Sequence, residues 1–291
     1  MKVVPRAPLG VVTVSYNSSA VLGPFLDSLR AVGTTPVEVV IVDNASQDIA
    51  NTEILASSAG ARIVALPDNR GYGAAVNAGV AYLAGRHEWV LISNPDITLH
   101  PGALDALVDE LRVRPEAGVA GPAILEPDGT LYPSARNLPS LRTGVGHALF
   151  AGPFPKNPWT RRYRAEREAS DEPRAVGWLS GSCLLVRTAA FTKIGGFDEG
   201  YFMYFEDVDL GRRMGQAGFS NLYVPSAQAT HLGGHSTKAD PGPMIHAHHV
   251  SAARYVSIRY SSPALAPLRL VIRVGLRVRE LLIIRRTARR R

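Results

Sequence analysis

The chain has 291 residues, of which 46% are hydrophobic and 20% charged, the composition of a globular protein with enough apolar residues for a sizeable core. The net charge of +7 is concentrated in residues 264–291, which hold nine arginines and one glutamate, so the body lacks the basic face that nucleic-acid binding requires. The single cysteine, Cys183, excludes an intramolecular disulfide and indicates a reducing compartment. No apolar segment of signal-peptide length follows the first eight residues, so we expect a protein on the cytoplasmic side.

The first 66 residues predict alternating strands and helices. Near-continuous β-branched runs, typical of strands buried on both faces of a parallel sheet, alternate with apolar residues at helical spacing. Strands are expected at 9–16, 37–44 and 62–66, and helices at 21–31 and after 45–48. This order predicts a doubly wound α/β sheet, in which ligands bind outside the carboxyl ends of the strands. Tyr16, Asp43 and Asn44 lie at those ends.

Residues 67–77 form a glycine-bearing loop that enters a helix, where exposed backbone N–H groups could bind an anion. The simpler interpretation is a turn that needs a positive φ at Gly71. A dinucleotide-binding G-x-G-x-x-G pattern fits poorly, because Val76 takes the place of the third glycine. The strand predicted at 88–93 ends in Asn94-Pro95-Asp96.

The rest of the chain predicts shorter elements around a long irregular segment. Strands are expected at 118–124, 176–186 and 220–224, a hairpin turn at 126–130, and helices at 102–112, 188–194, 210–217 and 246–260. Residues 132–175 carry several prolines and a charged run, and such long connections usually form lids or binding loops. His231 is expected in the loop beyond the last strand.

The segment 201–210 crowds three carboxylates, Glu206, Asp207 and Asp209, behind an aromatic run. Acids are seldom buried unless they are paired, bound to a metal or used in chemistry. Together with Asp96 and His231, these carboxylates suit a divalent cation such as Mg²⁺ or Mn²⁺ that keeps open positions for phosphate oxygens. A fixed carboxylate beside it could deprotonate a hydroxyl, so the pattern favours group transfer from a nucleotide diphosphate.

Seven motifs in unbroken order carry a family resemblance that extends over about residues 9–260. They are the opening Val-Thr-Val-Ser-Tyr-Asn at 12–17, Asp43-Asn44-Ala45-Ser46, Asn69-Arg70-Gly71-Tyr72-Gly73, Asn94-Pro95-Asp96, the segment 177–183, Gly196-Phe197-Asp198-Glu199 and Glu206-Asp207-Val208-Asp209. On these motifs the chain resembles the family 2 inverting glycosyltransferases of the GT-A fold. The resemblance implies a doubly wound mixed sheet flanked by helices in one catalytic domain, 1–263, with a nucleotide-sugar-binding half at about 9–130 and an acceptor-binding half at 131–263.

The resemblance also implies roles for individual residues. The nucleotide-binding set would be Tyr16, Asp43, Asn69, Arg70, Gly71 and Asp96, and the metal-binding set Asp96, His231 and Asn94. Asp207 corresponds to the catalytic base, with Glu206 orienting the acceptor. Trp178, Gly181 and Arg136 would contact the acceptor. Asn94 stands where the family's D-x-D motif has its first acid, and a neutral amide binds a hard cation less strongly than a carboxylate does.

Several of these residues also have a structural alternative. His231, as a single loop histidine, could be structural or solvated. Asp43 and Asp209 could be carboxylates at helix N-termini, and Asn94-Pro95-Asp96 could be a plain turn. Trp178 could be a core residue and Arg136 a surface arginine.

The substrates implied by the resemblance are a nucleotide sugar and a lipid-linked sugar. Tyr132-Pro133-Ser134-Ala135-Arg136, Asn157-Pro158-Trp159 and His235-Ser236-Thr237 are similar to the branch that moves L-rhamnose from TDP-rhamnose to N-acetylglucosamine on a polyprenyl diphosphate, in assembly of the arabinogalactan linker of the cell wall. Alternatives are the same fold acting on galactose or mannose with another lipid-linked or polysaccharide acceptor, and a membrane-surface binding protein that keeps the pocket without catalysis.

The tail, 264–291, predicts a basic amphipathic helix. Arg269, Arg273, Arg277 and Glu280 recur along one side, and Leu268, Val271, Ile272, Val274, Val278 and Leu282 share the other. Such a helix is typical of an interfacial membrane anchor, although it could also pack on the body or on a partner. We therefore expect a peripheral protein on the cytoplasmic face of the plasma membrane.

Overall fold

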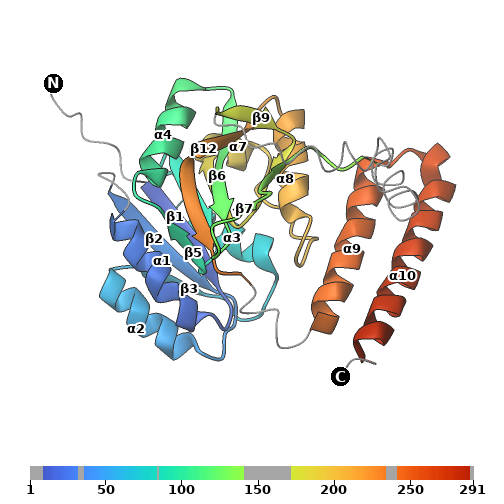
Figure 1. Cartoon of the computed structure of the whole chain (residues 1–291), viewed down its shortest axis with the longest axis horizontal. Helices are drawn as coiled ribbons and strands as arrows, with labels where there is room; N and C mark the ends of the chain where they lie inside the picture. Colours follow the sequence, from blue (N-terminus) through green and yellow to red (C-terminus); the bar gives the residue numbers. More distant parts are fainter. Residues whose placement is uncertain (1–8, 32–35, 84, 141–171, 234–240, 289–291) are drawn as a thin grey trace.

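A computed structural model describes residues 9–31, 36–83, 85–140, 172–233 and 241–288. A central sheet has helices on both faces, and a pair of long helices lies beside it (Figure 1). The first part of the chain forms β1 (Leu9–Ser15), α1 (Ser19–Ala31), β2 (Val37–Asp43), α2 (Ile49–Ala59), β3 (Arg62–Ala65), α3 (Tyr72–Tyr82), β4 (Trp89–Ser93), β5 (Ile97–Leu99), α4 (Ala103–Val113) and β6 (Ala117–Leu125). These elements follow the predicted alternation.

The second part of the chain completes the sheet and adds the helix pair. Its elements are β7 (Leu131–Tyr132), β8 (Ala135–Arg136), β9 (Arg174–Val176), β10 (Trp178–Leu179), β11 (Cys183–Arg187), α7 (Thr188–Lys193), α8 (Glu206–Gln216), β12 (Ser220–His231), α9 (Pro241–Arg259), a 3₁₀ turn η1 (Pro263–Leu265) and α10 (Ala266–Ala288). The motifs at 157–159 and 235–237 lie outside the described residues.

The sheet is mixed, as the resemblance implies. Its strands run in the order β3-β2-β1-β4-β11-β6-β12-β5. The first four are parallel, β11 is antiparallel to β4 and β6, and β12 is parallel to β6 but antiparallel to β5. Because β1 and β4 are central neighbours, the segments that leave their carboxyl ends emerge side by side.

Two hydrophobic cores hold the layers together. Side chains of α1, α2 and α4 pack on one face of the sheet, and those of α3, α7 and α8 pack on the other. Val11 of β1 belongs to the first core and Val12 to the second. This division explains the unbroken apolar runs in the sequence, since a strand covered on both faces needs apolar residues at odd and even positions.

Three differences from the sequence prediction affect the residues around the site. The strand predicted at 176–186 is broken into three, and Gly177 lies at the first break, where a Cβ would come within 2.3 Å of the Leu138 nitrogen. β12 passes Pro225 through a register shift between Val224 and Gln228, so His231 ends a strand instead of lying in a loop. α8 begins at Glu206, four residues earlier than predicted, so the acid cluster occupies a helical first turn.

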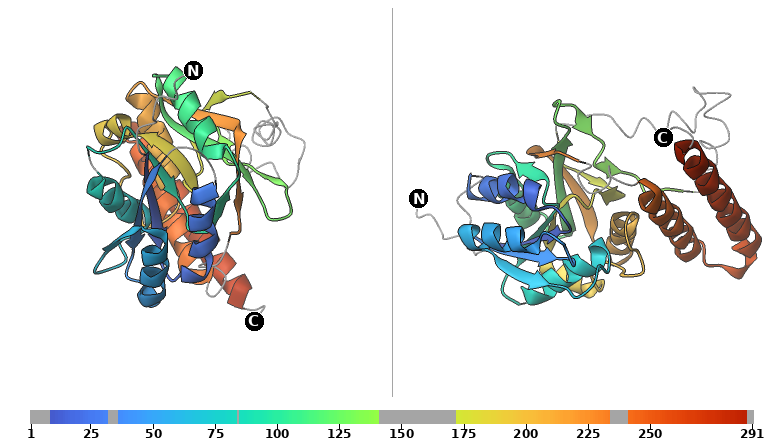
Figure 2. Two further views of the ribbon diagram at one scale, coloured as in Figure 1. Left: turned by 90° about the vertical axis from the view of Figure 1, so that its left-hand side faces the viewer. Right: turned by 90° about the horizontal axis from the view of Figure 1, so that it is seen from below.

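The helices α9 and α10 form a hairpin on one side of the molecule, and the views in Figures 1 and 2 both place α9 between the sheet domain and α10. Arg269 donates hydrogen bonds to the carbonyls of Tyr260 and Ser262, and Arg273 donates one to Ser257 Oγ. The arginine side of the predicted amphipathic helix therefore faces α9. Among the described residues, no helix is both long and apolar enough to cross a membrane.

Candidate functional site

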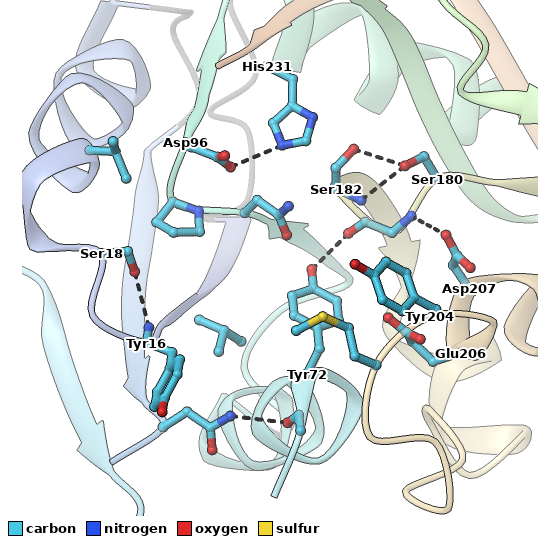
Figure 3. Close-up of a pocket in the computed structure, with 18 of the residues that line it drawn as sticks. Tyr16, Ser18, Tyr72, Asp96, Ser180, Ser182, Tyr204, Glu206, Asp207 and His231 are labelled. Carbon is cyan, nitrogen blue, oxygen red and sulfur yellow. Dashed lines mark hydrogen bonds and ion pairs between the residues drawn. The ribbon is translucent and has the colours of Figure 1, made fainter. Parts of the chain in front are cut away.

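A pocket of about 350 Å³ opens beside the carboxyl ends of β1 and β4, where the sequence predicted a ligand site. The predicted site residues that line it are Tyr16, Asn69, Gly71, Asn94, Asp96, Gly181, Glu206, Asp207 and His231. Tyr16 lies on one side of the pocket, and Glu206 and Asp207 lie on the other (Figure 3). Tyr16 and His231, which are 215 positions apart in the chain, thus share one cavity.

Hydrogen bonds connect the turn that follows β1, which carries Tyr16, to the turn that follows β2. Ser18 Oγ accepts a hydrogen bond from the Tyr16 nitrogen, and Ser46 Oγ accepts one from the Asn17 nitrogen. Asp43 is fully buried, and its Oδ1 accepts the Ser46 N–H at 2.9 Å. Asp43 Oδ2 has no hydrogen-bond partner among the described residues. Asp43 does not line the pocket. Its Oδ2 is a buried acceptor without a partner, next to Asn44, which lines the pocket.

Asn44 connects β2 to the glycine-bearing loop, a role that we did not assign from the sequence. Its amide nitrogen donates to Asn69 Oδ1 at 2.9 Å, and its Oδ1 accepts the Arg70 N–H at 3.2 Å. Asn69 Oδ1 also accepts the Gly71 N–H. The side chain of Arg70 turns outward to an exposed ion pair with Glu199, so of residues 69–71 it is Asn69 and Gly71 that line the pocket.

Asp96 and His231 meet at the pocket because β5 pairs with the end of β12. His231 Nε2 lies 3.1 Å from Asp96 Oδ1, and both side chains are half-buried (Figure 3). Asn94 also lines this part of the pocket. The described residues contain no group of three His, Cys, Asp or Glu side chains placed to hold a metal ion. One carboxylate and one imidazole nevertheless fit a divalent cation that takes its other ligands from water and substrate phosphates.

Asp207 is held from two sides by backbone N–H groups. Its Oδ2 accepts the Gly181 N–H at 3.0 Å, and its Oδ1 accepts the Val208 N–H at 2.8 Å. Tyr72 Oη donates to the carbonyl of Gly181 at 2.7 Å and so holds the same peptide segment in place. Burial raises the pKa of Asp207, although both N–H groups favour the ionised form. The result is an oriented carboxylate whose proton affinity is higher than that of an exposed aspartate.

Glu206 lies beside Asp207 in a less hydrated position. Its side chain is only 7% exposed, and Oε2 has no hydrogen-bond partner among the residues that the structure describes. Burial and the neighbouring charge of Asp207 raise the pKa of Glu206 to about 8. At neutral pH Glu206 is therefore mainly protonated and can donate a hydrogen bond.

The segment before α8 forms a wall of the pocket. Met203 and Tyr204 line the cavity, while Phe202 is exposed. Tyr204 and Phe205 both adopt positive φ values, 69° and 65°, which bring the chain sharply into α8. The ring of His248 on α9 packs edge-on against both side chains. The predicted aromatic wall thus depends on α9 for its support.

Two predicted acceptor residues lie outside this pocket. The guanidinium of Arg136 sits 5.6 Å from the ring centroid of Trp178, and the paired strands β8 and β10 carry the two residues. Trp178 Nε1 donates to the carbonyl of Asn137. Gly181 is the one predicted acceptor residue that lines the pocket. Asp209 points away, buried between Arg212 and Arg213, so it stabilises α8.

The protonated state of Glu206 predicts a pH-dependent stability. Between its ordinary pKa of 4.5 and about 8, the folded protein keeps a proton that the unfolded chain releases, so the free energy of unfolding falls as the pH rises. Glu206→Gln removes this contribution and should flatten the slope between pH 5 and 8, as measured by urea unfolding. The exposed acid Glu53 provides the control, since Glu53→Gln should leave the slope unchanged. An equal slope for wild type and Glu206→Gln would contradict the assignment.

Comparison with known proteins agrees with the geometry. The model of the family described as "Glycosyl transferase family 2" matches residues 10–195. The N-acetylglucosaminyl-diphospho-decaprenol L-rhamnosyltransferase of Mycobacterium tuberculosis is 46% identical over 97% of this chain and 94% of its own length. The structure of GalNAc-T7 with UDP, GalNAc and Mn²⁺ shares 16% identity with a TM-score of 0.62, over 86% of this chain and 48% of that one.

A second solved structure confirms the expected GT-A fold. The mannosyltransferase PcManGT from Pyrobaculum calidifontis, in complex with GDP-Man and Mn²⁺, has a TM-score of 0.59 at 15% identity, over 91% of this chain and 68% of that one. At such identities the likeness shows the fold alone, whereas the family match and the mycobacterial relative extend to the sequence. The chain therefore belongs to glycosyltransferase family 2.

Proposed function

We propose that this chain moves L-rhamnose from the nucleotide sugar TDP-rhamnose to the N-acetylglucosamine of a polyprenyl-diphosphate-linked acceptor, with inversion at the anomeric carbon. The observation that carries the proposal is the Asp207 carboxylate, held by two backbone N–H groups in the pocket that also contains Asp96 and His231. The choice of donor and acceptor is supported by the mycobacterial relative, whose name states an L-rhamnosyl transfer to N-acetylglucosaminyl-diphospho-decaprenol.

The donor nucleotide occupies the side of the pocket formed by Tyr16 and the turns after β1 and β2. The unpartnered Oδ2 of Asp43 would accept the ring N–H of a pyrimidine base, because a buried acceptor without a partner gains a hydrogen bond from such a donor. Since Asp43 is buried and does not line the pocket, this contact requires the turns after β1 and β2 to shift. Tyr16, 42% exposed, is free to stack on that base. Asn69 and Gly71 contribute the adjoining wall, which Asn44 keeps in position.

Asp207 removes the proton from the acceptor hydroxyl as the hydroxyl oxygen attacks the anomeric carbon. Its raised pKa suits this task, because a base is more effective when its conjugate acid is weaker. The bond between the anomeric carbon and the diphosphate oxygen breaks on the opposite face, so direct displacement inverts the centre. The protonated Glu206 donates a hydrogen bond to the acceptor and orients it, while Met203 and Tyr204 exclude water.

A divalent cation, Mg²⁺ or Mn²⁺, would be held by Asp96 and His231, with Asn94 nearby. When bound, it neutralises the charge that develops on the departing diphosphate. The Mn²⁺ in the two solved relatives supports a metal of this class for the fold. Arg136 and Trp178 form a second surface beside the pocket, which we assign to the acceptor.

A lipid-linked acceptor is presented at a membrane surface, so we assign the enzyme to the cytoplasmic face of the membrane as a peripheral protein. We accordingly divide the chain into a catalytic domain, 1–263, and a membrane-associating tail, 264–291. Within the domain, 9–130 handles the nucleotide sugar and 131–263 the acceptor.

A donor panel tests the transfer itself. Purified protein is incubated with TDP-rhamnose, UDP-galactose or GDP-mannose and an N-acetylglucosaminyl-diphospho-polyprenol, and the labelled product is measured. We expect transfer from TDP-rhamnose, and at least a ~10³-fold lower kcat for Asp207→Asn with unchanged nucleotide affinity, because the amide cannot take the proton. Asp109→Asn, on the exposed face of α4, is the control. Transfer from another donor alone, or normal turnover by Asp207→Asn, would contradict the proposal.

Metal removal tests whether Asp96 and His231, beside β5 and at the end of β12, bind a divalent cation. EDTA should abolish transfer, and added Mg²⁺ or Mn²⁺ should restore it. Asp96→Asn should raise the metal concentration for half-maximal transfer at least about tenfold, since it removes the only carboxylate of the pair. Asp27→Asn on α1, an exposed substitution of the same kind, should leave that concentration unchanged. Full activity in EDTA would rule out this site.

A further inference from the structure

The helix α10 exposes an apolar stripe along its whole outer side. Six aliphatic side chains recur at helical spacing there, with exposed fractions between 44% and 68%: Leu270, Val271, Val274, Val278, Leu281 and Leu282. From Leu270 to Leu282 the stripe extends roughly 18 Å along the helix axis. A contiguous exposed apolar strip of this length marks a contact site.

The orientation of α10 is reversed relative to an ordinary surface helix, because its polar side faces the protein. Glu280 is 4% exposed, and its Oε1 lies 2.7 Å from His246 Nδ1 of α9. Arg277 donates to the same carboxylate, and Arg273 donates to Ser257 of α9. These charged contacts satisfy the inner side of α10, so the apolar side has to point outward.

The positive charge beside the apolar stripe indicates what kind of partner binds it. Between 266 and 285, α10 carries five arginines and one glutamate, and both Arg279 and Arg285 are exposed. An apolar strip flanked by exposed guanidinium groups matches the boundary of a bilayer with anionic headgroups, where the aliphatic side chains enter the acyl region and the arginines reach the phosphates. A copy of the same chain would bring like charges together and fits less well.

We propose that the apolar stripe of α10 docks on an anionic lipid bilayer, with the helix axis parallel to the membrane plane. This inference rests on the proposed function, since a lipid-linked acceptor is presented at such a surface, and it names the residues that contact the lipid. The helix lies in the interface, consistent with the lack of a membrane-crossing helix among the described residues.

The hairpin also connects the bilayer to the pocket. Across from α10, the Ser251 hydroxyl of α9 donates to the Met203 carbonyl at 2.8 Å, and His248 packs on Tyr204 and Phe205. Figure 2 shows α9 between α10 and the sheet domain. Docking of α10 therefore sets the distance and tilt of the pocket wall relative to the lipid surface.

Vesicle binding tests the inference on the full-length protein. Phosphatidylcholine vesicles with and without phosphatidylglycerol are sedimented with wild type, with Val274→Asp/Val278→Asp, and with the control Ile54→Asp/Val113→Asp. The control residues are exposed to 66% and 69% on α2 and α4, away from the hairpin. We expect strong binding to the anionic vesicles only. The α10 variant should lose at least about tenfold in vesicle affinity, because each aspartate puts a charge where a valine would enter the acyl region. Unchanged melting temperatures show that all three proteins are folded.

Two further measurements make the outcomes distinct. The α10 variant should lose transfer to a vesicle-embedded polyprenyl acceptor but keep transfer to a short-chain, water-soluble one. Arg279→Glu/Arg285→Glu should abolish the preference for anionic vesicles. Equal vesicle binding by wild type and the α10 variant would overturn the inference, as would a wild-type dimer that the α10 variant disrupts without any vesicle binding. If no acceptor is rhamnosylated but the vesicle contrast persists, the proposed function fails and the docking surface stands.

Discussion

The Asp207 carboxylate, accepting the N–H of Gly181 and of Val208, is the contact on which the rest of the site depends. Gly181 reaches the Asp207 carboxylate because the segment between β10 and β11 leaves the strand conformation. Tyr72 on α3 holds the same segment through a hydrogen bond to the Gly181 carbonyl. A Cβ at Gly181 would lie 3.3 Å from Asp207 Cβ, so a side chain there would crowd the carboxylate. Elements from both halves of the chain thus converge on one carboxylate.

Burial separates the roles of two adjacent acids. Glu206 and Asp207 share the first turn of α8, but the N–H groups of Gly181 and Val208 stabilise the charge of Asp207, whereas burial and the charge of Asp207 keep Glu206 protonated up to about pH 8. With little water nearby, ionising both acids would cost more free energy than ionising one, because the two negative charges repel each other. One acid can therefore accept a proton while its neighbour donates a hydrogen bond.

Local patterns in the sequence were sufficient for most strands and helices, since apolar runs and helical spacing report burial directly. They missed β5, which has three residues, and the continuation of β12 beyond Pro225, where a register shift accommodates the proline. The contact between Tyr72 and Gly181 spans 109 positions and leaves no local signal. For α10, the two-sided pattern was visible in the sequence, but only the packing on α9 shows that the arginine side faces inward.

We propose that Asp207 is the group that contacts the acceptor hydroxyl. A crystal structure of the protein with TDP and an N-acetylglucosaminyl-diphospho-lipid analogue measures this contact directly. We expect an Asp207 carboxylate oxygen within about 3.2 Å of the hydroxyl that receives the sugar, which is the reach of a general base. A complex in which that hydroxyl lies against Glu206 or Asp96 instead, with Asp207 beyond hydrogen-bonding distance, would contradict it.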